Sequence, residues 1–220
     1  VDLYDRTKPL PKYMETLIQD GKYIYNAFML SEESLQLMGN DFAIFYCDFV
    51  DAILSYRSEV ACPEKVYAEM LGAVIYYDFP IFDACAKPFE FFKHYNQETQ
   101  MISIEYKYSE DEHRKLLDRF LKAADEMLAT VTPDMTDIEK AKNIYHELCT
   151  RMVYDDSALE DLERKACYFA YLHNSGVCVT FANVYNQLLT QVGIKTTLAT
   201  CEYDETMGHV WSVVTLDGKD

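Results

Sequence analysis

Apolar residues recur at helical spacing through most of this chain and change to strand-like alternation near its C-terminal end. The helical stripes cover residues 41–57, 63–78, 109–128, 136–152 and 178–192. Alternating apolar residues predict strands over residues 101–108, 195–203 and 209–216. Because helices come first and a helix then leads into an antiparallel sheet, the pattern predicts the α+β class.

Two capping boxes and a glycine mark where three of these helices begin or end. Ser109 with Glu112, and Thr136 with Glu139, have the spacing at which two side chains satisfy free backbone N–H groups at a helix start. Gly193 follows the last helical stripe and is expected to end that helix as its C′ residue. These local signals support the helices independently of the apolar pattern.

Composition argues against several classes of protein and partner. The 220 residues are 50% apolar and 26% charged, with 7 Gly and 6 Pro, which is globular rather than disordered or collagenous composition. No apolar run is long enough to span a bilayer, so we expect no membrane insertion. The net charge of −17 is spread over both halves of the chain, which disfavours nucleic acid and anionic lipid as partners.

The seven cysteines have irregular spacings without a CxxC motif, which argues against a zinc site. Several of them lie in apolar helical stripes, where cysteine packs as a small hydrophobic residue, so we expect buried free thiols. The sequence also lacks a glycine-rich phosphate loop and the spacing of a calcium loop. We therefore expect neither a metal nor a cofactor.

One cysteine and one histidine are candidates for chemistry. Gly176, Val177 and Cys178 stand where a loop becomes a helix, and a helix N-terminus favours the thiolate that acts as a nucleophile. The free N–H groups there could also hold an oxyanion. Gly208 and His209 begin a later strand, which is the order expected for a nucleophile and its general base. The pair alone is a weak signal in a chain with seven cysteines, and thiol packing is the alternative.

The residues around this pair resemble the transglutaminase-like superfamily, which includes bacterial members and is related to papain-like thiol enzymes. The resemblance is carried by residues 137–146, 152–155, 176–182 and 208–211. It implies a papain/transglutaminase-like core, in which a nucleophile helix packs on an antiparallel sheet. A mostly helical N-terminal region would precede this core.

The same resemblance implies domains and residue roles. Residues 1–108 would be the N-terminal region, with a short strand pair, and residues 109–220 would be the core. Cys178 would be the catalytic nucleophile, His209 the general base, and Trp211 a substrate-binding residue, with core packing as the alternative for Trp211. We expect ordinary surface or partly buried positions for the other histidines, which are His94, His113, His146 and His173.

The family's usual triad includes an acid on the strand after the histidine strand. Asp217 and Gly218 form a strong hairpin signal, and a hairpin turning there would place the residue that faces His209 beyond Asp220. We therefore expect the triad acid near position 224, outside this chain, and the sequence to be a truncated piece. The missing return strand would leave a sheet edge through which the chain could form an oligomer.

These expectations converge on a thiol-dependent hydrolase of peptide or isopeptide-type amide bonds, whose partner is a protein or peptide substrate. A protein cross-linking transglutaminase, or an inert binding or scaffold module on the same fold, are the alternatives. The start without Met and the frequent export of this family favour an extracytoplasmic location. The free cysteines favour a reducing compartment instead.

Overall fold

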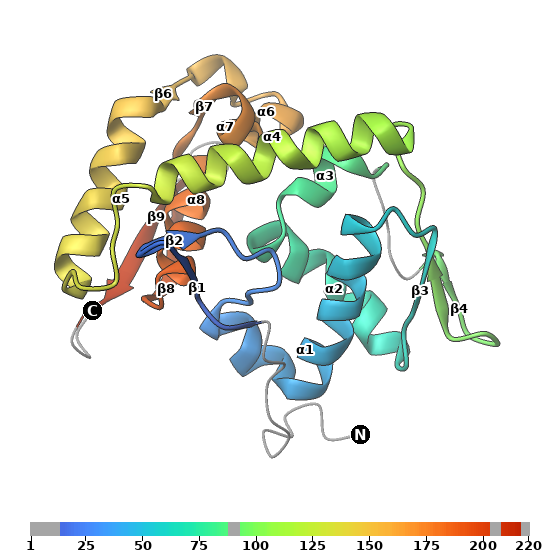
Figure 1. The fold of residues 1–220 in the computed structure, drawn as a ribbon. Helices are drawn as coiled ribbons and strands as arrows, with labels where there is room; N and C mark the ends of the chain where they lie inside the picture. The colour runs from blue at the N-terminus through green and yellow to red at the C-terminus, as the bar shows by residue number, and fades with distance from the viewer. Residues whose placement is uncertain (1–13, 88–92, 203–207, 217–220) are drawn as a thin grey trace. The chain divides into compact units, whose positions relative to one another are not determined.

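The computed structural model describes residues 14–87, 93–202 and 208–216 of the chain (Figure 1). These residues form two compact units, of which the first contains Ala27–Arg119 and the second combines Thr16–Asn26 with the chain from Phe120 onward. The mixture of helices and strands confirms the predicted α+β class. The predicted boundary at residue 108 separates an N-terminal region from a core that would fold independently. The division into two units does not test this boundary, which stays a prediction.

The helices of the first unit are α1 (Glu32–Leu54), α2 (Lys65–Asp78), α3 (Ile81–Cys85) and the first half of α4 (Glu110–Leu128). α1 begins after its N-cap Ser31, whose hydroxyl oxygen accepts from the N–H of Ser34 at 3.2 Å. This start lies well before the predicted one at residue 41. Gly39, with a φ of 76°, interrupts helical geometry inside α1, so the apolar stripe predicted only the part that follows it.

A small antiparallel sheet of the order β3-β5-β4 completes the first unit. Its strands are β3 (Glu59–Ala61), β4 (Tyr95–Asn96) and β5 (Met101–Ser103). β5 is shorter than the predicted strand over residues 101–108. Tyr106 nevertheless forms an isolated antiparallel bridge with Ala86, which accounts for the alternation of apolar residues beyond the end of β5.

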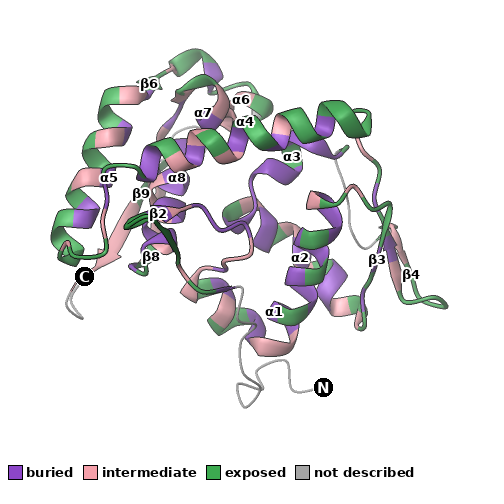
Figure 2. Ribbon diagram, in the orientation of Figure 1, coloured by how far each residue is buried: buried purple, intermediate pink, exposed green. Residues whose placement is uncertain are grey.

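Aromatic side chains dominate the buried part of the first unit, where Phe42, Phe49, Phe79 and Phe82 are at most 2% exposed. Buried positions recur along α1 and α2 (Figure 2). His113 is also fully buried, which corrects the expectation of a surface or partly buried histidine. Its Nε2 lies 2.8 Å from the carbonyl oxygen of Ile53. Desolvation lowers the pKa of His113, so a neutral imidazole fills this position.

Most elements of the second unit come after α4 in the sequence. A short hairpin, formed by β1 (Leu17–Gln19) and β2 (Lys22–Ile24), comes before α1. The elements after α4 are α5 (Asp137–Arg151), β6 (Val153–Tyr154), η3 (Asp156–Ala158), α6 (Leu162–Lys165), α7 (Cys167–His173), β7 (Ser175–Gly176), α8 (Cys178–Gln191), β8 (Lys195–Glu202) and β9 (Gly208–Thr215). The capping box at the start of α5 is confirmed, since Thr136 and Glu139 satisfy each other's N–H groups.

α8 packs against α5, α7 and both strands of the antiparallel β8–β9 pair (Figure 1). Gly193, with a φ of 82°, ends α8 as predicted. The N–H of Gly193 donates to Thr190 O, and the N–H of Ile194 donates to Leu189 O, which is the pattern of a Schellman motif. The turn brings β8 directly back along α8.

The early segment Thr16–Asn26 belongs to the second unit through specific hydrogen bonds. Gln191 at the end of α8 accepts from the N–H of Asn26 at 2.6 Å and donates to Asn26 O at 3.1 Å. The N–H of Tyr25 donates to the carboxylate of Asp125 at 2.7 Å. Within the described part of the chain, no helix combines the length and the apolar character needed to cross a membrane.

Candidate active site

The start of α8 is built around the small size of Gly176. A Cβ at this position would lie 2.5 Å from Cβ of Thr180, which is fully buried above it. The hydroxyl oxygen of Thr180 accepts from the N–H of Val177 at 3.3 Å, and the same hydroxyl donates to Lys165 O at 2.9 Å. These contacts fix the first turn of the helix, so Cys178 occupies the first helical position with its side chain partly exposed.

A cavity of about 360 Å³ opens beside Cys178 within the second unit. His209 and Trp211, the other two residues predicted from the sequence, line the same cavity. Cys178 comes from the N-terminus of α8 and the other two come from β9, so the fold brings together residues about thirty positions apart in the sequence. The cavity also contains residues of α5 and β6, to which no role was assigned from the sequence.

Tyr154 is the most important of these additional residues. β6 pairs in parallel with β7, and this register sets Tyr154 opposite Gly176, two residues before the cysteine. Desolvation raises the pKa of the Tyr154 hydroxyl, and the nearby Cys178 thiol raises it further. Tyr154 and Cys178 line the same cavity.

The strand that carries His209 is anchored directly to the cysteine helix. Ser212 on β9 donates a hydrogen bond from its hydroxyl to Ala182 O on α8 at 3.2 Å. His209 itself is exposed, and its ring lies 6.0 Å from the ring of Trp211 with the planes 26° apart. Trp211 is 43% exposed, so the structure places it at the mouth of the cavity rather than in a closed core.

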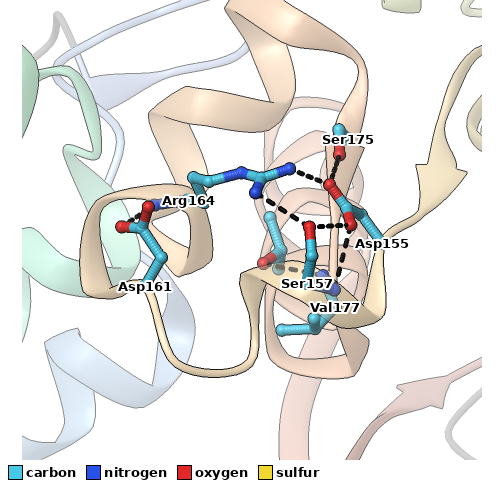
Figure 3. A network of polar contacts seen from close by, with 7 residues as sticks. Asp155, Ser157, Asp161, Arg164, Ser175 and Val177 are labelled. Carbon is cyan, nitrogen blue, oxygen red and sulfur yellow. Dashed lines mark hydrogen bonds and ion pairs between the residues drawn. The ribbon is translucent and has the colours of Figure 1, made fainter.

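A polar network holds the segment after Tyr154 against the strand that leads to Cys178 (Figure 3). Asp155 lies at its centre: it forms an ion pair with Arg164 and accepts from the hydroxyl of Ser157 at 2.6 Å and of Ser175 at 3.4 Å. Arg164 also donates to the hydroxyl oxygen of Ser157 at 2.9 Å. The hydrogen bonds from Ser157 and the charge of Arg164 hold the pKa of Asp155 below its usual value.

The other cysteines divide into buried and accessible thiols. Burial raises the pKa of Cys62 to about 11 and that of Cys85 to about 12, which makes both thiols poor nucleophiles. Cys149 on α5 is exposed and lines the same cavity as Cys178. The seven cysteines all lie within the described residues, and none of them forms a disulfide.

Two expectations concern the surroundings of His209. The predicted hairpin turn at Asp217 and Gly218 lies outside the described residues, and the triad acid expected near position 224 stays a prediction. β9 pairs with β8 along its described length, so that Cys201 is opposite His209. Among the described residues, no group of three or more His, Cys, Asp or Glu side chains is arranged to hold a metal ion.

Two comparisons with known proteins bear on this site. Residues 122–220 match a family model described as the transglutaminase-like superfamily, and this range includes every residue that lines the cavity. A comparison with curated proteins found no match.

Proposed function

Since residues 122–220 are a transglutaminase-like superfamily domain, we propose that this chain is a thiol-dependent enzyme acting on amide bonds. Cys178 is the nucleophile and His209 is the general base. The observation that carries the proposal is that these two residues, from different elements, line one cavity. The position of Cys178 at the first residue of a helix supports it, because a helix N-terminus favours the thiolate.

The reaction proceeds in two steps. His209 takes the proton from the Cys178 thiol, and the sulfur attacks the carbonyl carbon of the amide to form a tetrahedral intermediate. The carbon–nitrogen bond then breaks, and His209 returns the proton to the leaving amine, which leaves an acyl-thioester on Cys178. In the second step His209 removes a proton from water, and the resulting hydroxide attacks the thioester carbonyl carbon. The carbon–sulfur bond then breaks and releases the carboxylic acid, and the protonated His209 returns the proton to the Cys178 sulfur.

The negative charge of the tetrahedral intermediate needs hydrogen-bond donors. The backbone N–H of Cys178 lies at the free N-terminal end of α8 and can serve as one donor. The hydroxyl of Tyr154 lies close to the Cys178 sulfur, which raises its pKa. It is therefore placed to turn its proton toward an oxyanion that forms beside that sulfur, and we assign it as the second donor.

Hydrolysis is our first proposal for the fate of the acyl-thioester, because Cys178 is partly exposed and His209 is exposed, so water reaches both groups. A primary amine in place of water would give a cross-linking transglutaminase by the same steps. Trp211 borders the mouth of the cavity, where it would contact the peptide that carries the amide.

Alkylation with iodoacetamide at neutral pH, followed by peptide mass spectrometry, tests the nucleophile. We expect Cys178 to react faster than the accessible Cys149 and Cys201, and much faster than the buried Cys62 and Cys85. Equal slow reaction of Cys178 and Cys149 would contradict an activated thiol and would favour an inert module.

Turnover tests the reaction itself. The full chain should release the fluorophore from fluorogenic peptide amides, and Cys178→Ala should abolish release while it leaves the Tm nearly unchanged. Tyr108→Phe is the control, since it changes an exposed side chain of the first unit that has no part in the proposed chemistry. Loss of activity in both variants, or unfolding of Cys178→Ala, would overturn the assignment.

A further inference from the structure

The cavity beside Cys178 differs in charge from the chain as a whole. Asp, Glu, Lys and Arg make up 26% of the sequence, so a random set of twelve residues would contain about three of them. Among the twelve described residues that line the cavity there is none. A charged side chain that entered this cavity would lose its water and would find no Asp, Glu, Lys or Arg partner among the described lining residues, which is unfavourable.

Aromatic rings from three elements surround the space. Tyr145 of α5 and Tyr185 of α8 have ring centroids 6.0 Å apart with planes at 73°, and Tyr154 of β6 stacks on Phe181 of α8 at 6.0 Å and 28°. The hydroxyl of Tyr185 donates to Ala141 O at 3.1 Å, which fixes that ring in place. Walls of this kind offer ring faces and edges to an apolar or aromatic group.

Several of these rings are exposed. Tyr145 is 60% exposed and Tyr154 is 50% exposed, and Trp211 on β9 is 43% exposed. Large apolar side chains that gather around one hollow, rather than scatter singly, mark a ligand-binding site. The volume of about 360 Å³ is at the small end of ligand cavities, so it suits one bulky side chain rather than a long segment.

We propose that Tyr145, Tyr154, Phe181 and Tyr185 form a subsite for an uncharged aromatic or bulky aliphatic side chain on the acyl side of the scissile amide. This inference rests on the proposed function, because it concerns the substrate of Cys178. The acyl side is assigned because Phe181 and Tyr185 lie on α8, which carries the sulfur that holds the acyl group, and Tyr154 and Tyr145 contact these two rings. The leaving amine must meet His209 on β9 instead.

Binding tests the subsite without any turnover. Trp211 is the single tryptophan of the sequence and lines the cavity, so tryptophan fluorescence reports on this site alone. Titration of the full-length Cys178→Ala variant with N-acetyl-phenylalanine amide should give a saturable fluorescence change, and N-acetyl-glutamate amide should give none. Adding Tyr145→Ala should weaken the binding several-fold, whereas Tyr108→Ala, which removes an exposed ring of the first unit, should not. Equal binding of both amides would overturn the inference.

Turnover separates this inference from the proposed function. Fluorogenic amides that differ only in the acyl-side residue should be cleaved with kcat/KM at least about 10-fold higher for Phe and Leu than for Glu and Lys. Cleavage without this preference would overturn the subsite and leave the thiol mechanism standing. Selective binding of the phenylalanine amide without cleavage of any substrate would support the subsite and overturn the proposed reaction.

Discussion

The hydroxyl of Tyr154 lies close to Cys178 in the same cavity, which makes it the most informative single group to remove. Tyr154→Phe keeps the ring that stacks on Phe181 and deletes only the oxygen. We expect kcat for amide cleavage to fall by roughly 100-fold with KM nearly unchanged, because an oxyanion donor acts in the transition state. Steady-state kinetics on the fluorogenic amides measure both quantities.

The matched control for this variant is Tyr108→Phe, which removes an exposed hydroxyl in the first unit, outside the cavity. Its kcat should equal that of the unchanged chain. A Tyr154→Phe variant with an unchanged kcat would show that Tyr154 is only a wall of the cavity.

Asp78 is a second residue whose surroundings predict a measurable effect, in this case on stability. Burial raises its pKa from 3.8 to about 6, although the hydroxyl of Ser34 donates to its carboxylate at 2.5 Å and the N–H of Ser31 donates at 3.0 Å. The folded state therefore binds the proton more tightly than the unfolded state. This contribution to stability is complete below the unfolded pKa and is lost as the pH rises through about 6.

Asp78→Asn removes this titration and keeps an oxygen that can accept from Ser31 and Ser34. We expect the variant to gain on the order of 3 kcal/mol relative to the unchanged chain between about pH 4 and about pH 7.5. Urea unfolding at both pH values measures the difference. The exposed Asp111→Asn should show no such trend, and a difference for Asp78→Asn that does not vary with pH would contradict the assignment.

The secondary-structure elements show which parts of the site the sequence could predict. The helix that carries Cys178 and the strand that carries His209 were predicted almost to the residue, because their apolar patterns are long and Gly193 has a local signature. β6 and β7 are two residues each, too short for any periodicity to indicate them. Their parallel pairing places Tyr154 beside Cys178, so its contact with the cysteine could not be predicted.

The junction between β7 and α8 carries the third prediction. Gly176→Ala would bring a Cβ to within 2.5 Å of the buried Thr180 side chain, which is held on both sides by hydrogen bonds. We expect this overpacking to cost about 1–3 kcal/mol and to lower the Tm in thermal unfolding followed by circular dichroism.

Gly208→Ala is the matched control for that change, because a Cβ there meets its nearest neighbour, Cys201 O, only at 3.5 Å. Its Tm should stay close to that of the unchanged chain. Equal Tm values for the two variants would show that the start of α8 can shift to accept a larger residue.

For the molecule as a whole, the sequence predicted the α+β class and the transglutaminase-like core. It predicted the structure of the first unit in less detail. The burial of His113 was not predicted, because it depends on contacts with residues far away in the sequence, among them Ile53. β8 and β9 form a two-stranded sheet in the described part of the chain, and self-association through an edge of that sheet stays a prediction.

The net charge of −17 gives a prediction that belongs to the whole chain. Most of the ion pairs that the structure contains, such as Lys115 with Asp111 and Lys87 with Glu105, are exposed and contribute little. Repulsion among the excess carboxylates should therefore dominate the response to salt. We expect the Tm to rise by about 3 °C, equivalent to about 1 kcal/mol, between about 20 mM and about 300 mM NaCl at neutral pH. KCl should give the same rise if screening is the cause, and a Tm that falls with salt would mean that the exposed ion pairs outweigh the repulsion.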